Sequence, residues 1–205
     1  MCCRYYIEEK KELEELFENV KSSRLTQRMV EVYGRPFKTS GESFPTDIVP
    51  AIAPDREGKK SVFPMTFGFT QERGGKPLLN ARAETAGVKP TFRKAWTRNR
   101  CIVPASYYFE WEHFLSPTGA KKTGDKYMIQ PDGHTFTWLC GLYRIENGMP
   151  QFVILTKEPA DNLRWLHDRM PVMLPEEMIE NWVRPESDPA GLMEHVLTDM
   201  VWEKA

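Results

Sequence analysis

The chain has 205 residues, a formal net charge of −1, 40% hydrophobic residues and 28% charged residues. This composition is typical of a globular protein and excludes an intrinsically disordered or fibrous one. No apolar run approaches the ~20 residues that a membrane helix needs, and the N-terminus lacks the apolar core of a signal peptide. We therefore expect no membrane association and a cytoplasmic location, associated with the nucleoid if the source is bacterial. Any nucleic-acid site must be a local patch, because the chain is not basic overall.

The first predicted element is an amphipathic helix within residues 7–20. Leu13, Leu16, Phe17 and Val20 recur there at helical spacing, with charged residues between them. The proline-rich stretch 35–54 that follows predicts an ordered loop. Residues 61–69 predict a strand, and residues 71–77 predict a turn.

The middle of the chain reads as β-structure, because it is rich in aromatic and β-branched residues separated by turn signals. Short helices are expected just before His167, after Pro175 and around Leu192. The order of these elements predicts one α+β domain, residues 1–205, built around a strongly bent sheet or barrel with helices at both ends, the C-terminal ones within 176–200. The predicted strands are 100–112, interrupted by a turn, 126–130, 135–145 and 151–156.

The four cysteines include no C-x-x-C pair, and the four histidines are scattered. Structural zinc sites need closely spaced ligand pairs, so the spacing predicts no metal site. A disulfide is not expected in a cytosolic chain, and no motif indicates a cofactor. Cys101 and Cys140 lie in apolar runs and are interpreted as buried packing thiols.

Cys2 is the first candidate for chemistry. Removal of Met1 would leave an α-amine, with a reference pKa of about 7.7–8.0, on the same residue as a thiol of about 8.5. The amine can form an imine with an aldehyde, and the thiol can then close a five-membered thiazolidine ring. The alternative is that residue 2 is an ordinary terminal residue with no role.

Two further candidates are Glu110 and His167. A carboxylate between Phe109 and Trp111 would have a raised pKa if it were buried, which suits general acid–base catalysis. The imidazole of His167 could move a proton near neutral pH. In the alternative interpretation, Glu110 faces solvent and His167 is a helix-end residue paired with Asp168.

The segment from Arg82 to Arg100 carries six basic residues and one acidic residue, with Phe92 and Trp96 among them. Cations with interleaved aromatic rings suit single-stranded nucleic acid, where phosphates meet charges and bases stack on rings. Arg98 is a DNA-binding candidate on this ground, and Arg82 offers a planar fork for phosphate. The alternative is an ordinary solvated basic face.

Taken together and in this order, the motifs resemble the SOS response-associated peptidase family, or SRAP domain. They span residues 1 to about 175 and are specific as a set, although each is short. The matching pieces are MCCRY (1–5), PMTFGF (64–69), NARAET (80–85), RCIVPASYYFEW (100–111), CGLY (140–143), ILT (154–156) and LHDRMPVML (166–174).

The resemblance implies a compact α+β domain around a twisted, β-barrel-like mixed sheet. It also implies a catalytic set of Cys2 as crosslinking nucleophile, Asn80 to position the sugar and the amine, Glu110 for acid–base catalysis, and His167 for ring opening and crosslink reversal. Phosphate-binding arginines and stacking aromatics are implied at Arg4, Arg82, Phe67 and Trp111. Two positions depart from the family pattern, since Cys3 stands where glycine is usual and Phe67 where tryptophan is usual.

The function implied is a DNA-damage protein that removes its own Met1 and crosslinks through Cys2 to abasic sites in single-stranded DNA, shielding them from strand cleavage. We expect a monomer whose partner is single-stranded DNA. Two alternatives remain: a cysteine peptidase that acts on other proteins through Cys2, His167 and Asn80, and a non-covalent single-strand binding module. A family member whose activity Cys3 has altered is a third.

Overall fold

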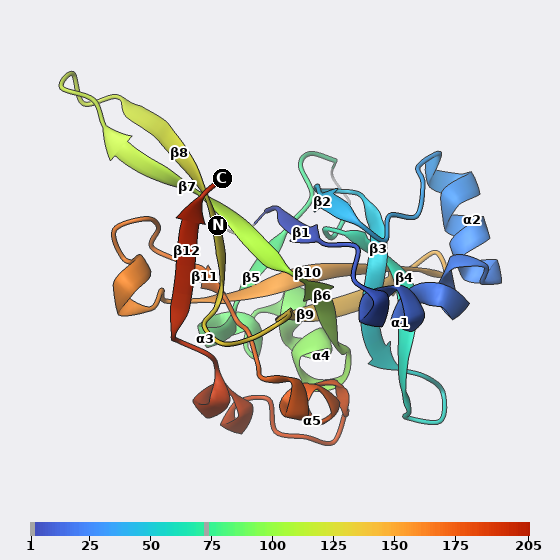
Figure 1. Cartoon of the computed structure of the whole chain (residues 1–205). Coiled ribbons are helices and arrows are strands. Elements are labelled where there is room, and N and C mark those ends of the chain that lie inside the picture. Colours follow the sequence, from blue (N-terminus) through green and yellow to red (C-terminus); the bar gives the residue numbers. More distant parts are fainter. Residues whose placement is uncertain (1–2, 72–73) are drawn as a thin grey trace.

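Five strands close into a mixed β-barrel at the centre of the computed structural model, which describes residues 3–71 and 74–205 (Figure 1). The strand order is β10, β4, β3, β6 and β9, and β9 pairs with β10 to close the ring. β4 and β10 run parallel, and the other neighbours run antiparallel. The strands are β3 (Ile48–Pro54), β4 (Lys60–Phe67), β6 (Arg100–Ala105), β9 (Thr137–Glu146) and β10 (Met149–Lys157). The prediction of an α+β fold around a barrel-like mixed sheet is confirmed.

A second, antiparallel sheet has the order β12, β8, β7, β1, β2. Only Ser106 separates β6 from β7, so the chain passes directly from the barrel into this sheet. The β7–β8 hairpin extends beyond the rest of the molecule (Figure 1). The strands are β1 (Tyr5–Ile7), β2 (Gly41–Ser43), β7 (Tyr107–Leu115), β8 (Lys121–Pro131) and β12 (Met200–Lys204).

Two short strands flank the C-terminal half of β10. β5 (Asn80–Arg82) pairs with it in parallel, Asn80 lying opposite Ile154, and β11 (Met170–Pro171) pairs with it antiparallel. The NARAET and LHDRMP motifs are far apart in sequence, but both are brought to this end of β10.

Helices lie at the periphery. The first prediction is confirmed by α1 (Lys11–Lys21), which buries Leu13, Phe17 and Val20. Neither α2 (Arg24–Tyr33) nor α4 (Pro90–Arg98) was predicted, and the chain ends in β12 instead of a helix. The remaining helical elements are α3 (Ala83–Ala86), η1 (Asp161–Leu163), η2 (Glu176–Met178), α5 (Ile179–Val183) and η3 (Gly191–His195). Within the described residues, no helix is long and apolar enough to cross a membrane.

The prediction of a loop over residues 35–54 is wrong for its second half. Proline lacks an N–H and disfavours central strands, yet β3 is a central strand of the barrel that contains Pro50. Pro50 lies opposite Pro64 of β4, and Ile48, Val49 and Ile52 are buried. Burial of the apolar residues of β3 therefore outweighs the unfavourable effect of Pro50 and Pro54 on strand formation.

Arg100 is buried and ties the C-terminal segment to the barrel. Its guanidinium donates to main-chain carbonyl oxygens of Trp182 (2.7 Å), Trp96 (2.8 Å), Thr97 (2.8 Å) and Ser187 (3.2 Å). Its side chain is fully buried. The sequence grouped Arg100 with the surface cations, but its contacts show a structural role that only tertiary packing reveals.

We expect Arg100→Met to lower the free energy of unfolding by about 3–5 kcal/mol, because it leaves several buried carbonyl oxygens without a donor. Urea denaturation followed by tryptophan fluorescence measures the change. Arg98→Met, an exposed arginine on the neighbouring helix, is the matched control. A loss no larger than that of the control would contradict the structural role.

Candidate functional site

Glu110 lies on β7 with its side chain turned into the protein, and the residue is only 4% exposed. Residues two apart share a face of a strand, so Glu110 follows Tyr108, which is also buried. Burial raises the pKa of the Glu110 carboxyl. The alternative that Glu110 faces solvent is therefore wrong, because the buried face of β7 continues as far as this residue.

His167 lies in the loop between η1 and β11, facing Glu110. Its Nε2 is 3.8 Å from Glu110 Oε1, and its side chain is 14% exposed. Burial lowers the pKa of His167 to about 4, so the imidazole is neutral at neutral pH. A neutral imidazole beside a carboxyl of raised pKa forms a pair that can pass a proton in either direction.

The tautomer of His167 is set at its other nitrogen. Nδ1 lies 3.0 Å from the amide nitrogen of Arg169, which can donate to it, and 2.8 Å from Oδ1 of Asp168, which can only accept. With the proton on Nε2, the ring accepts from Arg169 and directs its own N–H toward Glu110. With the proton on Nδ1, it donates to Asp168 and presents a lone pair at Nε2. The carboxylate of Asp168 is largely exposed and can turn away, so the first tautomer meets no conflict. The second points the Nδ1 proton at the fixed N–H of Arg169 and therefore costs that hydrogen bond.

The first described residues lead toward this pair. Tyr5 of β1 pairs with Tyr108, and the N–H of Phe109 donates to the carbonyl of Arg4 at 3.0 Å. If this register is extended two residues toward the N-terminus, Cys3 lies opposite Glu110. Burial and then the negative charge of Glu110 raise the pKa of the Cys3 thiol, which agrees with that placement. Cys2, the predicted nucleophile, lies outside the described residues.

An ion pair joins the two motifs that meet at β10. Arg169 Nη2 donates to Glu84 Oε2 at 2.8 Å and to the carbonyl of Thr156 at 2.7 Å. Glu84 belongs to NARAET, and Arg169 belongs to the segment that carries His167. Asn80, at the start of β5, has its Nδ2 3.5 Å from the carbonyl of Ile154. The network holds the His167 loop and the Asn80 strand against the same part of β10.

Arg4 and Trp111, predicted DNA contacts, lie together at the edge of the site. The Arg4 guanidinium is 5.2 Å from the Trp111 ring centroid and forms an ion pair with Glu42 at 3.3 Å. Lys126 also pairs with Glu42, at 3.0 Å, and lies 3.4 Å from the Phe109 ring centroid. Cations and aromatic rings therefore alternate across β1, β7 and β8, with one carboxylate that holds both cations in place.

Phe67 requires a correction. It was expected to stack on a base, but it has no exposed surface, and its ring stacks on Phe152 with centroids 5.0 Å apart. Its side chain is enclosed by the barrel, so Phe67 is a core residue.

Arg82 and Arg98 are exposed. Arg98 ends α4, which Figure 1 places on the side of the barrel away from the β7–β8 hairpin.

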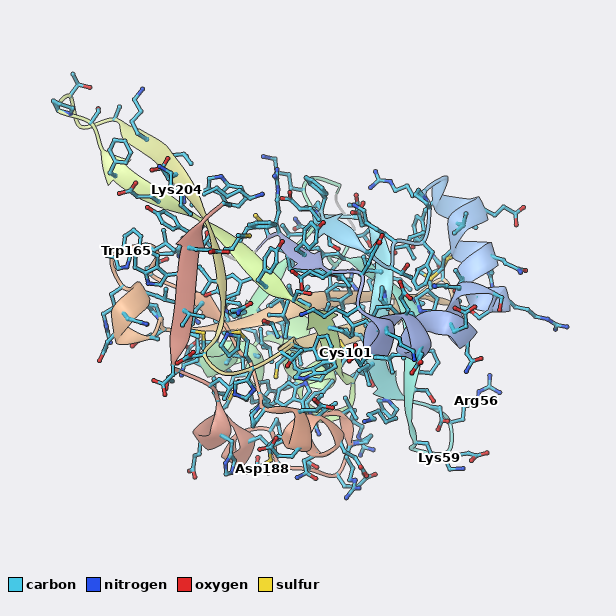
Figure 2. All side chains as sticks on the ribbon, viewed as in Figure 1. Arg56, Lys59, Cys101, Trp165, Asp188 and Lys204 are labelled. Atoms are coloured by element: carbon cyan, nitrogen blue, oxygen red, sulfur yellow. The ribbon has the colours of Figure 1, made fainter. Side chains whose placement is uncertain are left out.

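Sequence reasoning missed an exposed aromatic cluster beside the site. Trp165 and Trp202 are 44% and 45% exposed, and their ring centroids are 5.1 Å apart. Tyr127, opposite Glu110 on β8, contacts Trp165 with centroids 5.2 Å apart. Figure 2 shows Trp165 on the side of the molecule where β12 and the hairpin meet. The sequence signal for this cluster is Trp165, a large aromatic residue only two positions before His167.

A cavity of about 510 Å³ opens next to this cluster. It brings His113 and Phe114 of β7 to the same open space as Trp165 and His167, although about 50 residues of chain separate the two pairs. Its lining residues are His113, Phe114, Arg164, Trp165, Leu166, His167 and Asp168.

Residues 1–204 match the family described as SOS response associated peptidase (SRAP). The chain belongs to the SRAP family. This SRAP protein is 34% identical over 131 residues to "Abasic site processing protein YoqW" of Bacillus subtilis, covering 62% of this chain and 56% of that protein. It is 31% identical over 140 residues to "Abasic site processing protein YedK" of Escherichia coli, covering 64% and 59% respectively. The matched region spans less than two thirds of each relative.

Solved structures share the fold of this SRAP protein. A protein from Bacteroides thetaiotaomicron aligns with a TM-score of 0.70 at 21% identity, covering 99% of this chain and 91% of that one. A phage-related protein from Bordetella bronchiseptica also aligns with a TM-score of 0.70 at 21% identity, covering 100% and 94%. At this level of identity the likeness establishes the architecture alone.

Proposed function

We propose that this protein binds single-stranded DNA and bonds covalently to abasic sites through Cys2, after removing its own Met1. The observation that carries the proposal is the pair of buried Glu110 and half-buried His167, 3.8 Å apart, at the point toward which β1 leads. Cys2 is one peptide bond from Cys3, and consecutive Cα atoms are only ~3.8 Å apart. Membership of the SRAP family, and relatives named abasic site processing proteins, support the choice of an abasic site as substrate.

The reaction begins with the opened sugar of the abasic site, which presents an aldehyde. The Cys2 amine attacks the aldehyde carbon, and the resulting carbinolamine loses water to give an imine. The Cys2 thiol then adds to the imine carbon, its sulfur forming the new C–S bond while a proton passes to nitrogen. The product is a thiazolidine, and the net loss is one water. Holding both nucleophiles next to one carbon supplies much of the rate through proximity.

Glu110 and His167 move the protons in this scheme. The carboxyl of Glu110, with its pKa raised by burial, can protonate the departing hydroxyl and then accept a proton from the amine or the thiol. His167 presents either an N–H or a lone pair at Nε2, and this suits it to assist opening of the sugar ring. Asn80 orients the sugar end through its side-chain amide.

Two surfaces next to the pair suit the flanking DNA. Arg4 and Lys126 offer positive charge for phosphates beside Trp111, and Trp165 with Trp202 offers exposed rings on which bases can stack. Arg82 is also proposed to contact phosphate. Arg98 lies on the side of the barrel away from the hairpin, so it would meet only DNA that continues around the barrel from the site. The local charge explains how a chain of net charge −1 can bind a polyanion.

The test is intact-protein mass spectrometry under denaturing conditions. The protein, with loss of Met1 verified by mass, is incubated with a single-stranded oligonucleotide containing one abasic site. The expected adduct has the summed mass less one water and survives without reductant. The matched control carries a tetrahydrofuran analogue, which keeps the shape of the site but has no aldehyde. Absence of an adduct from processed protein would overturn the covalent proposal, and cleavage of unrelated protein substrates would favour the peptidase alternative.

A further inference from the structure

Three side chains at the site gather more ligand atoms than the proposed chemistry uses. Glu110, His113 and His167 each bring one potential metal-ligand atom within 4.8 Å of the other two. Glu110 is buried, His167 is half-buried and His113 is exposed. His113 takes no part in the proposed reaction.

The placement of His113 beside Glu110 coincides with an irregularity in the hairpin, whose extra residue lies on β8. The two residues are three apart on β7, and regular alternation would put them on opposite faces. Trp111 pairs with Lys126 but His113 pairs with Thr123, so two steps along β7 match three along β8. Such irregularities re-aim side chains, often next to active sites. Just after the irregularity, the His113 ring packs edge to face against the His167 ring, with centroids 5.7 Å apart.

This set of ligands suits a metal ion of borderline softness such as Zn²⁺. Two imidazoles and one carboxylate form the ligand set of open zinc sites, in which the fourth position is left for water. Bonds of about 2.0–2.1 Å in tetrahedral geometry place ligand atoms roughly 3.4 Å apart. The 3.8 Å between His167 Nε2 and Glu110 Oε1 is within a few tenths of an ångström of that spacing. Mg²⁺ and Ca²⁺ prefer oxygen ligands and do not suit the set.

A supporting carboxylate is also present. Histidines that bind zinc usually donate their other ring N–H to a carboxylate or carbonyl, which fixes the ring and its tautomer. Asp168 Oδ1, 2.8 Å from His167 Nδ1, occupies that position. The tautomer with a proton on Nδ1 gives up the hydrogen bond from the Arg169 amide, donates to Asp168 instead and leaves Nε2 to bind a metal. The cavity lined by His113 and His167 gives an ion access from solvent.

We propose that Glu110, His113 and His167 bind one Zn²⁺ ion, and that this ion blocks the acid–base pair until it leaves or is removed. Ligand spacing along the chain predicted no metal site, because only the fold brings His167 to Glu110 and His113. Binding of Zn²⁺ is independent of the proposed function, whereas the block on crosslinking rests on it.

The site is tested with Zn²⁺ alone, in the absence of DNA. Chelator-treated protein carrying Cys2→Ala and Cys3→Ala, which removes the nearby thiols, is titrated with zinc chloride by isothermal titration calorimetry. We expect one ion per chain, and a Kd at least about 100-fold weaker when His113→Asn is added. His195→Asn, an exposed histidine on η3, is the matched control and should leave the Kd unchanged. No saturable binding, or equal binding by the His113→Asn protein, would overturn the proposal.

The block is tested by the rate of adduct formation on an abasic oligonucleotide with Zn²⁺ or with chelator. Each protein is compared with its own rate in chelator. Zinc is expected to slow the wild-type protein at least tenfold but to have little effect on His113→Asn. Equal slowing of both would place the ion on Cys2 and overturn the block. If no adduct forms in chelator, the proposed function fails, while the calorimetry still decides the zinc site.

Discussion

We expect the Cys2→Ala variant to form no stable covalent adduct with abasic DNA, whereas Cys3→Ala should leave adduct formation intact. Alanine at position 2 keeps the α-amine and can still form an imine, but it has no sulfur with which to close the ring. An imine hydrolyses on denaturation. Cys3 lacks a free amine because its nitrogen is in a peptide bond, and burial together with the charge of Glu110 raises the pKa of its thiol. Only the terminal cysteine offers both nucleophiles.

Denaturing gel electrophoresis of a labelled oligonucleotide measures this difference directly. Cys2→Ser refines it, because serine keeps the amine and a hydroxyl of similar size but closes the ring far less readily. Borohydride added to the Cys2→Ala reaction should trap the imine and restore a covalent band. An adduct from Cys2→Ala that survives denaturation without borohydride would show that a different residue reacts.

Glu110→Gln should slow adduct formation by about 10²–10⁴-fold, the range of a single general acid–base residue. Glutamine keeps the shape of the side chain but cannot exchange a proton, so affinity for single-stranded DNA should change little. Single-turnover kinetics measures the rate, and fluorescence anisotropy with the tetrahydrofuran oligonucleotide measures the affinity.

Glu112→Gln is the matched control, because it removes a carboxylate two residues further along β7. If both variants slow the reaction equally, a general loss of negative charge is responsible and Glu110 has no specific part. If Glu110→Gln loses affinity as much as rate, the carboxylate holds the local structure and is not an acid–base group.

The motifs and the β-rich centre could be predicted because their signals are local. Aromatic and β-branched residues marked the strands, and Glu110 stood out as the carboxylate in an apolar run. The α2 helix was missed because its Thr, Val and Tyr residues have modest helix propensity. Its caps were visible, since the Ser23 side chain accepts from the Thr26 amide and Gly34 adopts a φ of 62°.

The rest depended on contacts between distant segments. Arg100 looks like its neighbour Arg98 in sequence, but one is buried among carbonyl groups and the other is exposed. Phe67 was assigned to the DNA surface on resemblance alone, and only the closed barrel shows that its ring is enclosed. The approach of His113 to His167 requires both the irregular hairpin and the loop before β11, and no spacing along the chain encodes it.

β1 consists of only three residues, yet it positions the start of the chain. Tyr5 and Ile7 are buried between β2 and β7, and this anchors the strand. Short strands open locally at lower free energy than the whole fold. In the proposed reaction, opening of β1 would withdraw the amine and thiol of Cys2 from Glu110 without any change in their covalent structure. An aldehyde that meets the chain during synthesis would therefore react with Cys2 at the slow rate of an ordinary cysteine. Only completion of this sheet would bring Cys2 to Glu110 and speed the reaction.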